Sequence, residues 1–327
     1  MTRVLCLSAA DVAGVLTLEL CIPAVERVFA SYALKRSQVF PVVREPVPGT
    51  SGIFGVKSGF DQDQRLLGLK AGGFWADNRG LGLAAHQSVI LVFDPATGVP
   101  RAIVDANVIT RLRTGAVGAI AARALAPATS TVAAVVGCGV QGEIQTRALL
   151  WALPHIQEIR CVDAVPASVD AYLDALRDLD VRIRMVDGVE EAVGGADVIV
   201  TTTPSWKPVV VDAWVGTTAH ITAIGADTRG KQELEPEIFR RARVVVDDWD
   251  QAREIGESQH AHRLGWLTQD TLYAELGELC AGQKPGRGDY AGVTIFDATG
   301  IALQDLAAAG LAMDLAAARG IGQWVEI

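Results

Sequence analysis

Three glycines in the stretch TVAAVVGCGVQGEIQTRALLWA have a spacing that can bind phosphate. Gly137, Gly139 and Gly142 follow the order G-x-G-x-x-G, directly after an apolar run typical of a strand and directly before a helical pattern. The first glycine permits a tight turn, the second lets the backbone approach a pyrophosphate, and the third lets helix and strand pack closely. The alternative is a tight turn in an α/β domain that binds nothing. The strand, turn and helix together favour a dinucleotide site, with the phosphates at the helix N-terminus.

An acidic residue closes the next predicted strand, EIRCVDA, which follows the helix. Asp163 stands where a carboxylate can accept hydrogen bonds from the ribose hydroxyls of NAD. The same charge repels the additional phosphate of NADP, so the sequence favours NAD as the cofactor.

Two later segments, TTTPS (201–205) and IGADTRGK (224–231), follow apolar strands of the same series. Ligands of open α/β sheets lie beyond the carboxyl ends of the strands, so we expect cofactor contacts in both loops. Each threonine taken singly is equally suited to a turn.

Two lysines lie in the stretch GVKSGFDQDQRLLGLKAGG, between Gly55 and Gly73. Lys57 and Lys70 are each followed by a small residue and glycine, among apolar and small residues. They could be solvated charges at strand ends, or cations that bind an anion, and the stretch alone leaves both interpretations open.

The elements around these residues indicate an α/β protein with two domains. Residues 39–105 contain short β-type runs separated by turn clusters, which predicts an antiparallel sheet. From residue 107 a helical pattern leads into apolar strands spaced by helices, which indicates a Rossmann-type, doubly wound parallel sheet. We predict a smaller α+β substrate-binding and dimerisation domain at 1–112, an NAD-binding Rossmann domain at 113–300, and a C-terminal helix at 301–327 that packs back on the first domain.

Composition excludes several classes of protein. The chain has 327 residues, half of them hydrophobic, and a net charge of -9, which argues against a nucleic-acid partner. The apolar N-terminal stretch is interrupted by Asp11, Glu19 and Glu26, so we expect neither a signal peptide nor a membrane span. Five cysteines without a C-x-x-C suggest reduced thiols in a cytoplasmic protein. His260 and His262 form an H-x-H without further ligands nearby, so no metal is expected.

Several motifs together resemble the ornithine cyclodeaminase/μ-crystallin family. They are LKAGGFWADN, FDPATGVPRAIVDANVITRLRTGAVGAIAARALA, VVGCGVQGEIQ, IGADTRGKQEL and TIFDATGIALQDLA, and they occur in the family's order over nearly the whole chain. The resemblance implies a Rossmann domain, an N-terminal domain whose sheet pairs with that of a second subunit, and hydride transfer between a nicotinamide and the carbon of an α-imino or α-amino acid. It therefore implies a homodimer and a small-molecule substrate.

The resemblance also implies roles for individual residues. Catalytic roles fall on Asp227, as the acid/base carboxylate, and on Lys70. Substrate contacts fall on Arg44, Lys70, Arg113 and Thr299, and Lys57 joins them through its charge, because it departs from the family pattern. Cofactor contacts fall on Arg113, Thr114, Gly137, Gly139, Val140, Gln141, Gly142, Asp163, Thr202, Thr203, Ile224, Gly225, Asp227, Lys231 and Gly300.

These roles agree with the chemistry of the side chains. A guanidinium binds a carboxylate through two hydrogen bonds, which lysine cannot imitate. A carboxylate beside the reacting nitrogen can relay a proton if burial raises its pKa toward the working pH. For Asp227 the alternative is a helix N-cap after a strand.

Lys57 departs from the pattern of the ornithine cyclodeaminases, in which a GVIELMP-like stretch carries a glutamate suited to the distal ammonium of ornithine. Here the stretch reads GVKSGFD, and a lysine would repel that ammonium. An additional cation suits an additional anion, which points to an imino dicarboxylate, iminosuccinate, reduced by NADH to L-aspartate. FPVVRE, HQSVILVFDPATG and PGRGD also resemble the iminosuccinate reductases of the β-hydroxyaspartate pathway.

The sequence alone is also compatible with other functions. Relatives with other substrates include ornithine cyclodeaminases, alanine dehydrogenases and ketimine reductases. A crystallin-like protein that binds NAD(P) without turnover is the non-enzymatic alternative, and the complete cation set together with Asp227 argues against it.

Overall fold

The computed structural model describes residues 2–327, which form two compact units. The first combines the chain up to Ala116 with Ile301–Ile327, and the second is Val117–Gly300. The long helix α3 (Ala106–Leu125) contains the first boundary between them.

The first unit is built on a mainly antiparallel sheet in the order β18-β1-β7-β6-β5-β4-β2, with β3 paired to β4. Only β1 and β7 run parallel. The strands are β1 (Arg3–Leu7), β2 (Ser37–Val39), β3 (Val43–Pro46), β4 (Gly52–Asp61), β5 (Leu66–Trp75), β6 (His86–Phe93), β7 (Pro100–Asp105) and β18 (Gln323–Glu326), and the 3-10 turn η1 (Ala76–Leu81) follows β5. The antiparallel sheet predicted for residues 39–105 is therefore present.

After β1 there are two helices, α1 (Ala9–Val15) and α2 (Leu18–Ala33), because Thr17 accepts a hydrogen bond from Leu20 N and starts a new helix. The C-terminal helix α10 (Ala302–Arg319) is shorter than 301–327. It ends at Gly320, in the left-handed conformation, and β18 then pairs with β1.

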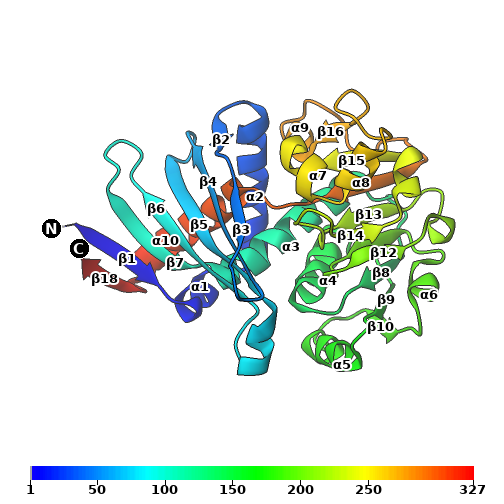
Figure 1. The fold of residues 1–327 in the computed structure, drawn as a ribbon, viewed down its shortest axis with the longest axis horizontal. Coiled ribbons are helices and arrows are strands. Elements are labelled where there is room, and N and C mark those ends of the chain that lie inside the picture. The colour runs from blue at the N-terminus through cyan, green and yellow to red at the C-terminus, as the bar shows by residue number, and fades with distance from the viewer. Residues whose placement is uncertain (1) are drawn as a thin grey trace. The chain divides into compact units, whose positions relative to one another are not determined.

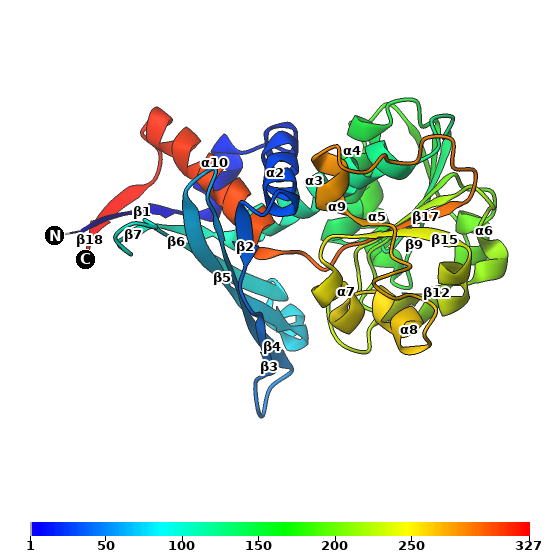
Figure 2. The same ribbon diagram turned by 90° about the horizontal axis from the view of Figure 1, so that it is seen from above.

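Helix α10 packs on one face of the sheet, and Figure 2 shows α2 on the same side. Glycines make this close packing possible: a Cβ on Gly68 would lie 2.7 Å from Leu306 Cδ2, and one on Gly59 would lie 3.3 Å from Leu303 Cδ2. The face of the sheet that carries Gly59 and Gly68 is therefore the covered face.

The second unit contains a parallel sheet in the order β10-β9-β8-β11-β13-β17-β15-β16 (Figure 1). Its strands are β8 (Val132–Val136), β9 (Glu158–Val162), β10 (Arg182–Met185), β11 (Val198–Thr201), β13 (His220–Ala223), β15 (Ala242–Val246), β16 (Ala274–Glu275) and β17 (Val293–Asp297). A separate pair is formed by β12 (Trp206–Val210) and β14 (Gln232–Leu234). The chain order reverses between β8 and β11, where such sheets bind their ligands.

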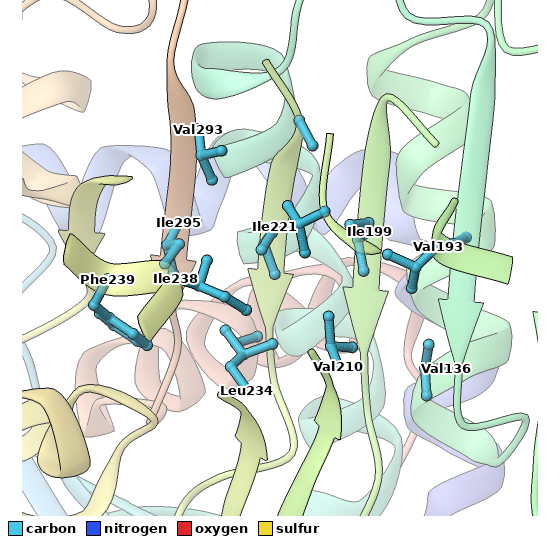
Figure 3. Close-up of a cluster of buried hydrophobic side chains, with 14 of the residues drawn as sticks. Val136, Val193, Ile199, Val210, Ile221, Leu234, Ile238, Phe239, Val293 and Ile295 are labelled. Atoms are coloured by element: carbon cyan, nitrogen blue, oxygen red, sulfur yellow. The ribbon is translucent and has the colours of Figure 1, made fainter. Parts of the chain in front are cut away.

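Helices cover both faces of this sheet, which confirms the predicted doubly wound α/β class. They are α4 (Val140–Ala152), α5 (Pro166–Ala175), α6 (Val189–Val193), α7 (Trp249–Ile255), α8 (Ser258–Arg263) and α9 (Leu276–Cys280), with 3-10 turns η2 (Asp212–Trp214) and η3 (Pro236–Arg240). One apolar cluster packs α4 and α5 against the sheet. A second packs α6, α7 and α8 against the other face, and Figure 3 shows its buried branched side chains, including Ile199, Ile221 and Ile295.

Candidate functional site

The first unit places three of the predicted substrate cations on one face of its sheet. Lys57 on β4 lies directly opposite Lys70 on β5, and Arg44 on β3 lies opposite Gly55, two residues from Lys57. Residues opposite each other, or two apart on one strand, point to the same face. This is the face that α10 covers, so the cations point toward that helix.

A carboxylate on α10 lies among these cations. Asp305 is buried, and its Oδ2 is 2.8 Å from Lys70 Nζ. Its Oδ1 accepts hydrogen bonds from Lys70 Nζ (2.9 Å) and from Arg113 Nε (3.0 Å). A single buried carboxylate therefore holds two of the predicted substrate residues, which come from β5 and α3.

Further polar groups fix both cations. Gln304 Oε1 accepts a hydrogen bond from Arg113 Nη1 at 3.0 Å, and Thr110 Oγ1 accepts one from Lys70 Nζ at 3.3 Å. Thr114, predicted to contact the cofactor, donates its hydroxyl to Thr110 O. The guanidinium of Arg113 is thus oriented through two of its nitrogens, and Nη2 is the nitrogen left to bind a ligand.

The electrostatics of this cluster are unusual for a lysine. The pKa of Lys70 is lowered to about 7, mainly by burial and also by the positive charges of Arg113 and Lys57, while Asp305 opposes the shift. The pKa of Asp305 is lowered by Lys70 and Arg113 against the effect of its burial. Lys70 can therefore exchange a proton near neutral pH, a property that the sequence alone did not reveal.

His86 on β6 is the next titratable group along the same face. Its Nδ1 lies 3.2 Å from Asn107 Oδ1, and its pKa is lowered by burial and by the charge of Lys70. A neutral imidazole adds no further positive charge beside Lys70.

In the second unit, the glycine turn has the geometry that a dinucleotide requires. Gly137 has a φ of +104°, in the left-handed region. A Cβ on Gly142 would lie 2.1 Å from Gly137 O, so only glycine lets helix and strand approach this closely. A Cβ on Gly139 would meet nothing within 4 Å, so the space where a pyrophosphate approaches the backbone is open. Val140 and Gln141 form the first turn of α4, where backbone N–H groups can hold an anion.

Asp163 lies beside this turn, directly after β9. Its Oδ2 accepts a hydrogen bond from Cys138 N and its Oδ1 accepts one from Val165 N, both at 2.8 Å. Each carboxylate oxygen has a second lone pair, so the side chain can also accept from ribose hydroxyls. The residues of the turn therefore fit NAD, with Asp163 tied to the glycine loop.

The two loops expected to contact the cofactor follow adjacent strands, β11 and β13. Thr202 Oγ1 donates to Gly137 O at 2.9 Å, which joins the first loop to the glycine turn. Thr203 N and Gly225 N, one from each loop, both donate to the carboxylate of Glu233. Ile224 lies beside Gly225 and donates its N–H to Thr201 O.

Asp227 forms an ion pair with Lys231, with 2.8 Å between Oδ1 and Nζ. Its side chain is 37% exposed, so the burial that the acid/base role was expected to require is not present in this structure. The N-cap alternative also fails, because no helix begins at Asp227.

Thr299 and Gly300 follow β17 and share one buried partner. Thr299 Oγ1 donates to Asp247 Oδ1 at 2.9 Å, and Gly300 N donates to Asp247 Oδ2. Gly300 adopts a φ of +79°. Asp247 therefore fixes the segment predicted to border the nicotinamide.

The two histidines of the H-x-H motif have local partners. His260 Nε2 lies 2.9 Å from Lys231 O, and His262 Nδ1 lies 3.0 Å from Leu267 O. Among residues 2–327, no group of three or more His, Cys, Asp or Glu side chains is arranged to hold a metal ion. None of the helices in that range has the length and apolar character of a membrane span.

Sequence reasoning missed Asp305, Glu233 and Asp247. Asp305 and Glu233 lie within the family motifs TIFDATGIALQDLA and IGADTRGKQEL, and a lone acid in the apolar stretch IALQDLAAAG is a signal that could have been used for Asp305. Asp247 lies outside these motifs and is followed directly by a second acid, Asp248, so its charge alone does not distinguish it.

Fold and site together define a two-unit protein of the dinucleotide-binding α/β class, with a buried cation cluster in its smaller unit. The model of the ornithine cyclodeaminase/mu-crystallin family matches residues 3–319. The chain belongs to this family, as its motifs indicated.

Two relatives are similar over their whole length. The iminosuccinate reductase of Paracoccus denitrificans is 40% identical over 97% of this chain and 98% of its own. Its crystal structure in complex with NAD+ matches with a TM-score of 0.93 over 99% of this chain and 100% of that one. The alanine dehydrogenase of Archaeoglobus fulgidus is 36% identical over 98% of both chains. An archaeal alanine dehydrogenase dimer with bound NAD matches with a TM-score of 0.94, 35% identity and full coverage of both chains.

Proposed function

We propose that this protein is an NADH-dependent reductase that converts iminosuccinate to L-aspartate. The chain is an NAD-dependent oxidoreductase of imino or amino acids, in keeping with its family and with the relatives solved with bound NAD. The choice of a dicarboxylate is the proposal, and the observation that carries it is the placement of Lys57 opposite Lys70.

Charge in the first unit favours a doubly negative ligand. Lys57, Lys70 and Arg113 all act electrostatically on Asp305, and Asp305 supplies one negative charge among them. With Lys70 protonated, the cations on this face outnumber Asp305, which favours a ligand with more than one negative charge. Lys57 faces Lys70 across neighbouring strands, so a second carboxylate near this pair reduces the repulsion between two like charges.

Each carboxylate can then be given a partner. Arg113 presents Nη2, while its Nε and Nη1 are held by Asp305 and Gln304. We assign the carboxylate next to the imine carbon to Arg113 and Lys70, and the distal carboxylate to Lys57 together with Arg44, which lies on the same face. Such positioning lowers the barrier because the substrate is held in one orientation.

Bound NADH would supply the hydride for the imine carbon, and the residues of the chain must supply the proton for the nitrogen. Lys70, with a pKa lowered to about 7, is protonated in a substantial fraction of molecules at neutral pH and can donate. Asp227, as a carboxylate paired with Lys231, is suited to stabilise the positive charge of a protonated imine. This division of roles refines the expectation that Asp227 is the acid/base residue.

NAD is held by the glycine turn and the loops of the second unit. In the proposal, Gly137, Gly139, Val140, Gln141 and Gly142 bind the pyrophosphate and Asp163 binds the ribose. The remaining contacts fall on Thr202, Thr203, Ile224, Gly225, Lys231 and Gly300. The open space at Gly139 is the feature that supports this arrangement.

The test compares substrates and a charge reversal. NADH oxidation is followed with iminosuccinate, with iminopyruvate formed from pyruvate and ammonia, and with a cyclic imine. We expect iminosuccinate to have the highest kcat/KM, and Lys57→Glu to lower it by roughly 100-fold while the monocarboxylates lose far less. Arg27→Glu, an exposed charge reversal on α2, is the matched control. Preference for a monocarboxylate, or equal losses for all substrates, would contradict the proposal.

We also propose that the protein is a homodimer formed through the first unit. Phe54, Val56, Leu69, Leu91 and Ile103 share the face of the sheet that points away from α10, and all are at least partly exposed. A contiguous apolar face of this kind marks an interaction surface. Sedimentation velocity should give the mass of a dimer, and Leu69→Lys should give a folded monomer. A wild-type monomer would refute the assignment.

A further inference from the structure

The buried carboxylate of Glu233 connects the two loops assigned to the cofactor. Its Oε1 accepts hydrogen bonds from Thr203 N and from Thr203 Oγ1 at 2.7 Å. Its Oε2 accepts from Thr201 Oγ1 at 2.7 Å and from Gly225 N at 2.8 Å. Donors from the segment that ends β11 and follows it therefore bond to both carboxylate oxygens, and the donor from the loop after β13 bonds to one of them, Oε2.

These contacts reach the glycine turn through one more residue. Thr202 lies between the two threonines that bind Glu233, and its hydroxyl donates to Gly137 O. A Cβ on Gly137 would lie 2.7 Å from Thr202 Oγ1, so the two segments are in close contact. The position of the loop after β11 thus affects the position of the turn that is assigned to the pyrophosphate.

Close packing leaves little freedom for alternatives around Glu233. A Cβ on Gly225 would lie 2.6 Å from the Glu233 carboxyl group and 2.1 Å from Thr203 O. The backbone of Glu233 is also fixed, because Glu233 N and Leu234 N donate to the carboxylate of Glu257. The pKa of Glu233 is raised, because the effect of burial outweighs the hydrogen bonds from the threonines, which lower it.

We infer that Glu233 is a positioning residue that holds the loops after β11 and β13 in the geometry that binds the dinucleotide. It acts through Thr203, Gly225 and Thr202 rather than by touching the cofactor. A carboxylate is required because the four donors are hydroxyl and amide groups, and only an ionised carboxylate accepts from all of them. The inference rests on the NAD part of the proposed function and not on the substrate.

The experiment is a fluorescence titration with NADH in the absence of any imino acid. We expect Glu233→Gln to raise the Kd for NADH by roughly 10-fold or more, because the amide NH2 faces donors and leaves them without an acceptor. Glu237→Gln, an exposed glutamate on η3, is the surface control. Glu257→Gln is the buried control, because its amide oxygen can still accept from both Glu233 N and Leu234 N, and it should change the Kd less.

Amide hydrogen exchange of the protein without cofactor gives a second readout. Thr203 and Gly225 should exchange faster in Glu233→Gln than in Glu257→Gln. Thr201→Val, which is nearly isosteric and removes one donor to Glu233, keeps the test available if Glu233→Gln does not fold; it should raise the Kd in the same direction. An unchanged Kd for NADH in Glu233→Gln and Thr201→Val would overturn the inference. An equally large rise in Glu257→Gln would overturn it as well. Failure of the wild type to bind NADH would instead overturn the proposed function, and the exchange data would still test the contacts of Glu233.

Discussion

Asp305 and Lys70 form a buried ion pair, with 2.8 Å between Oδ2 and Nζ, although they lie 235 residues apart in the sequence. The same carboxylate accepts a hydrogen bond from Arg113 Nε. Two of the four cations assigned to the substrate, Lys70 and Arg113, are therefore held by the protein itself before any ligand binds. This arrangement avoids a reorganisation of the cluster when substrate enters.

Replacing Asp305 with Asn should affect both stability and pH dependence. Lys70 and Arg113 would lose their buried counter-charge, which costs about 3–5 kcal/mol in the free energy of unfolding. Because the negative charge of Asp305 raises the pKa of Lys70, its loss should lower that pKa further below 7. The limb of the pH–rate profile on which activity falls with rising pH should then move to lower pH.

Urea unfolding and kcat/KM measured between pH 5 and 9 check this prediction. Asp314→Asn, an exposed carboxylate on the same helix, is the matched control and should change neither quantity. A loss of stability without movement of the pH limb would mean that Asp305 is only structural, and that Lys70 is not the proton donor.

In the glycine turn, two similar substitutions should differ in their effects on stability and on NADH binding. Gly139→Ala should fold normally, because its Cβ meets nothing within 4 Å, yet it should weaken NADH binding by filling the space assigned to the pyrophosphate. Gly142→Ala should lower both stability and binding, because its Cβ would lie 2.1 Å from Gly137 O. Thermal unfolding and NADH titration distinguish the two. Unchanged NADH binding in Gly139→Ala would place the pyrophosphate elsewhere.

Much of the fold could be predicted from local patterns. The strands β8, β9, β11, β13 and β15 of the second unit lie in apolar runs, and helix α3 has a long helical pattern, so both were found. The strands β10, β12, β14, β16 and β18 are short and carry charged or polar residues among the apolar ones, so they show neither an apolar run nor a periodicity. The break between α1 and α2 depends on a single cap at Thr17, which an apolar stretch conceals.

The site could be predicted only in part, for a physical reason. Residues that contact a ligand carry motifs, whereas residues that hold other residues depend on tertiary contacts between distant segments. Asp305 contacts Lys70 from another element, and Glu233 contacts Thr201 and Thr203 from 30 or more positions away. The shift of the Lys70 pKa depends on burial beneath α10, which no local pattern contains.

Asp163 should determine the preference for NAD, but its contact with Cys138 N gives it a second role. Asp163→Asn keeps an acceptor for that N–H while it removes the negative charge. We therefore expect the Kd for NADPH to fall and the Kd for NADH to rise by roughly 10-fold, because the repulsion of the 2′-phosphate disappears and a charge-assisted hydrogen bond to the ribose is lost. Asp187→Asn, an exposed carboxylate after β10, serves as control. An unchanged ratio of the two Kd values would show that Asp163 only supports the turn.

Asp297 predicts how the stability of the protein depends on pH. It is buried, accepts hydrogen bonds from Glu257 N (3.0 Å) and Ser258 N (2.8 Å), and has a pKa raised by burial to about 7 from an ordinary value of 3.8. Between these values the folded state keeps the proton that the unfolded state has lost. The contribution of Asp297 to stability is therefore complete below about pH 4 and is lost as the pH rises through 7, by at most about 1.4 kcal/mol per pH unit.

Asp297→Asn isolates this contribution, because Asn does not titrate and the other buried acids, Glu233, Glu257 and Asp247, remain in both proteins. The free energy of unfolding is measured with urea at several pH values from 4.5 to 8. We expect the free energy of unfolding of the wild type to fall relative to that of the variant as the pH rises, and the difference to become constant above about pH 8. A difference that is flat across this range, or that grows with pH, would show that Asp297 is already ionised in the folded protein at low pH. The hydrogen bonds from Glu257 N and Ser258 N would then outweigh the effect of burial.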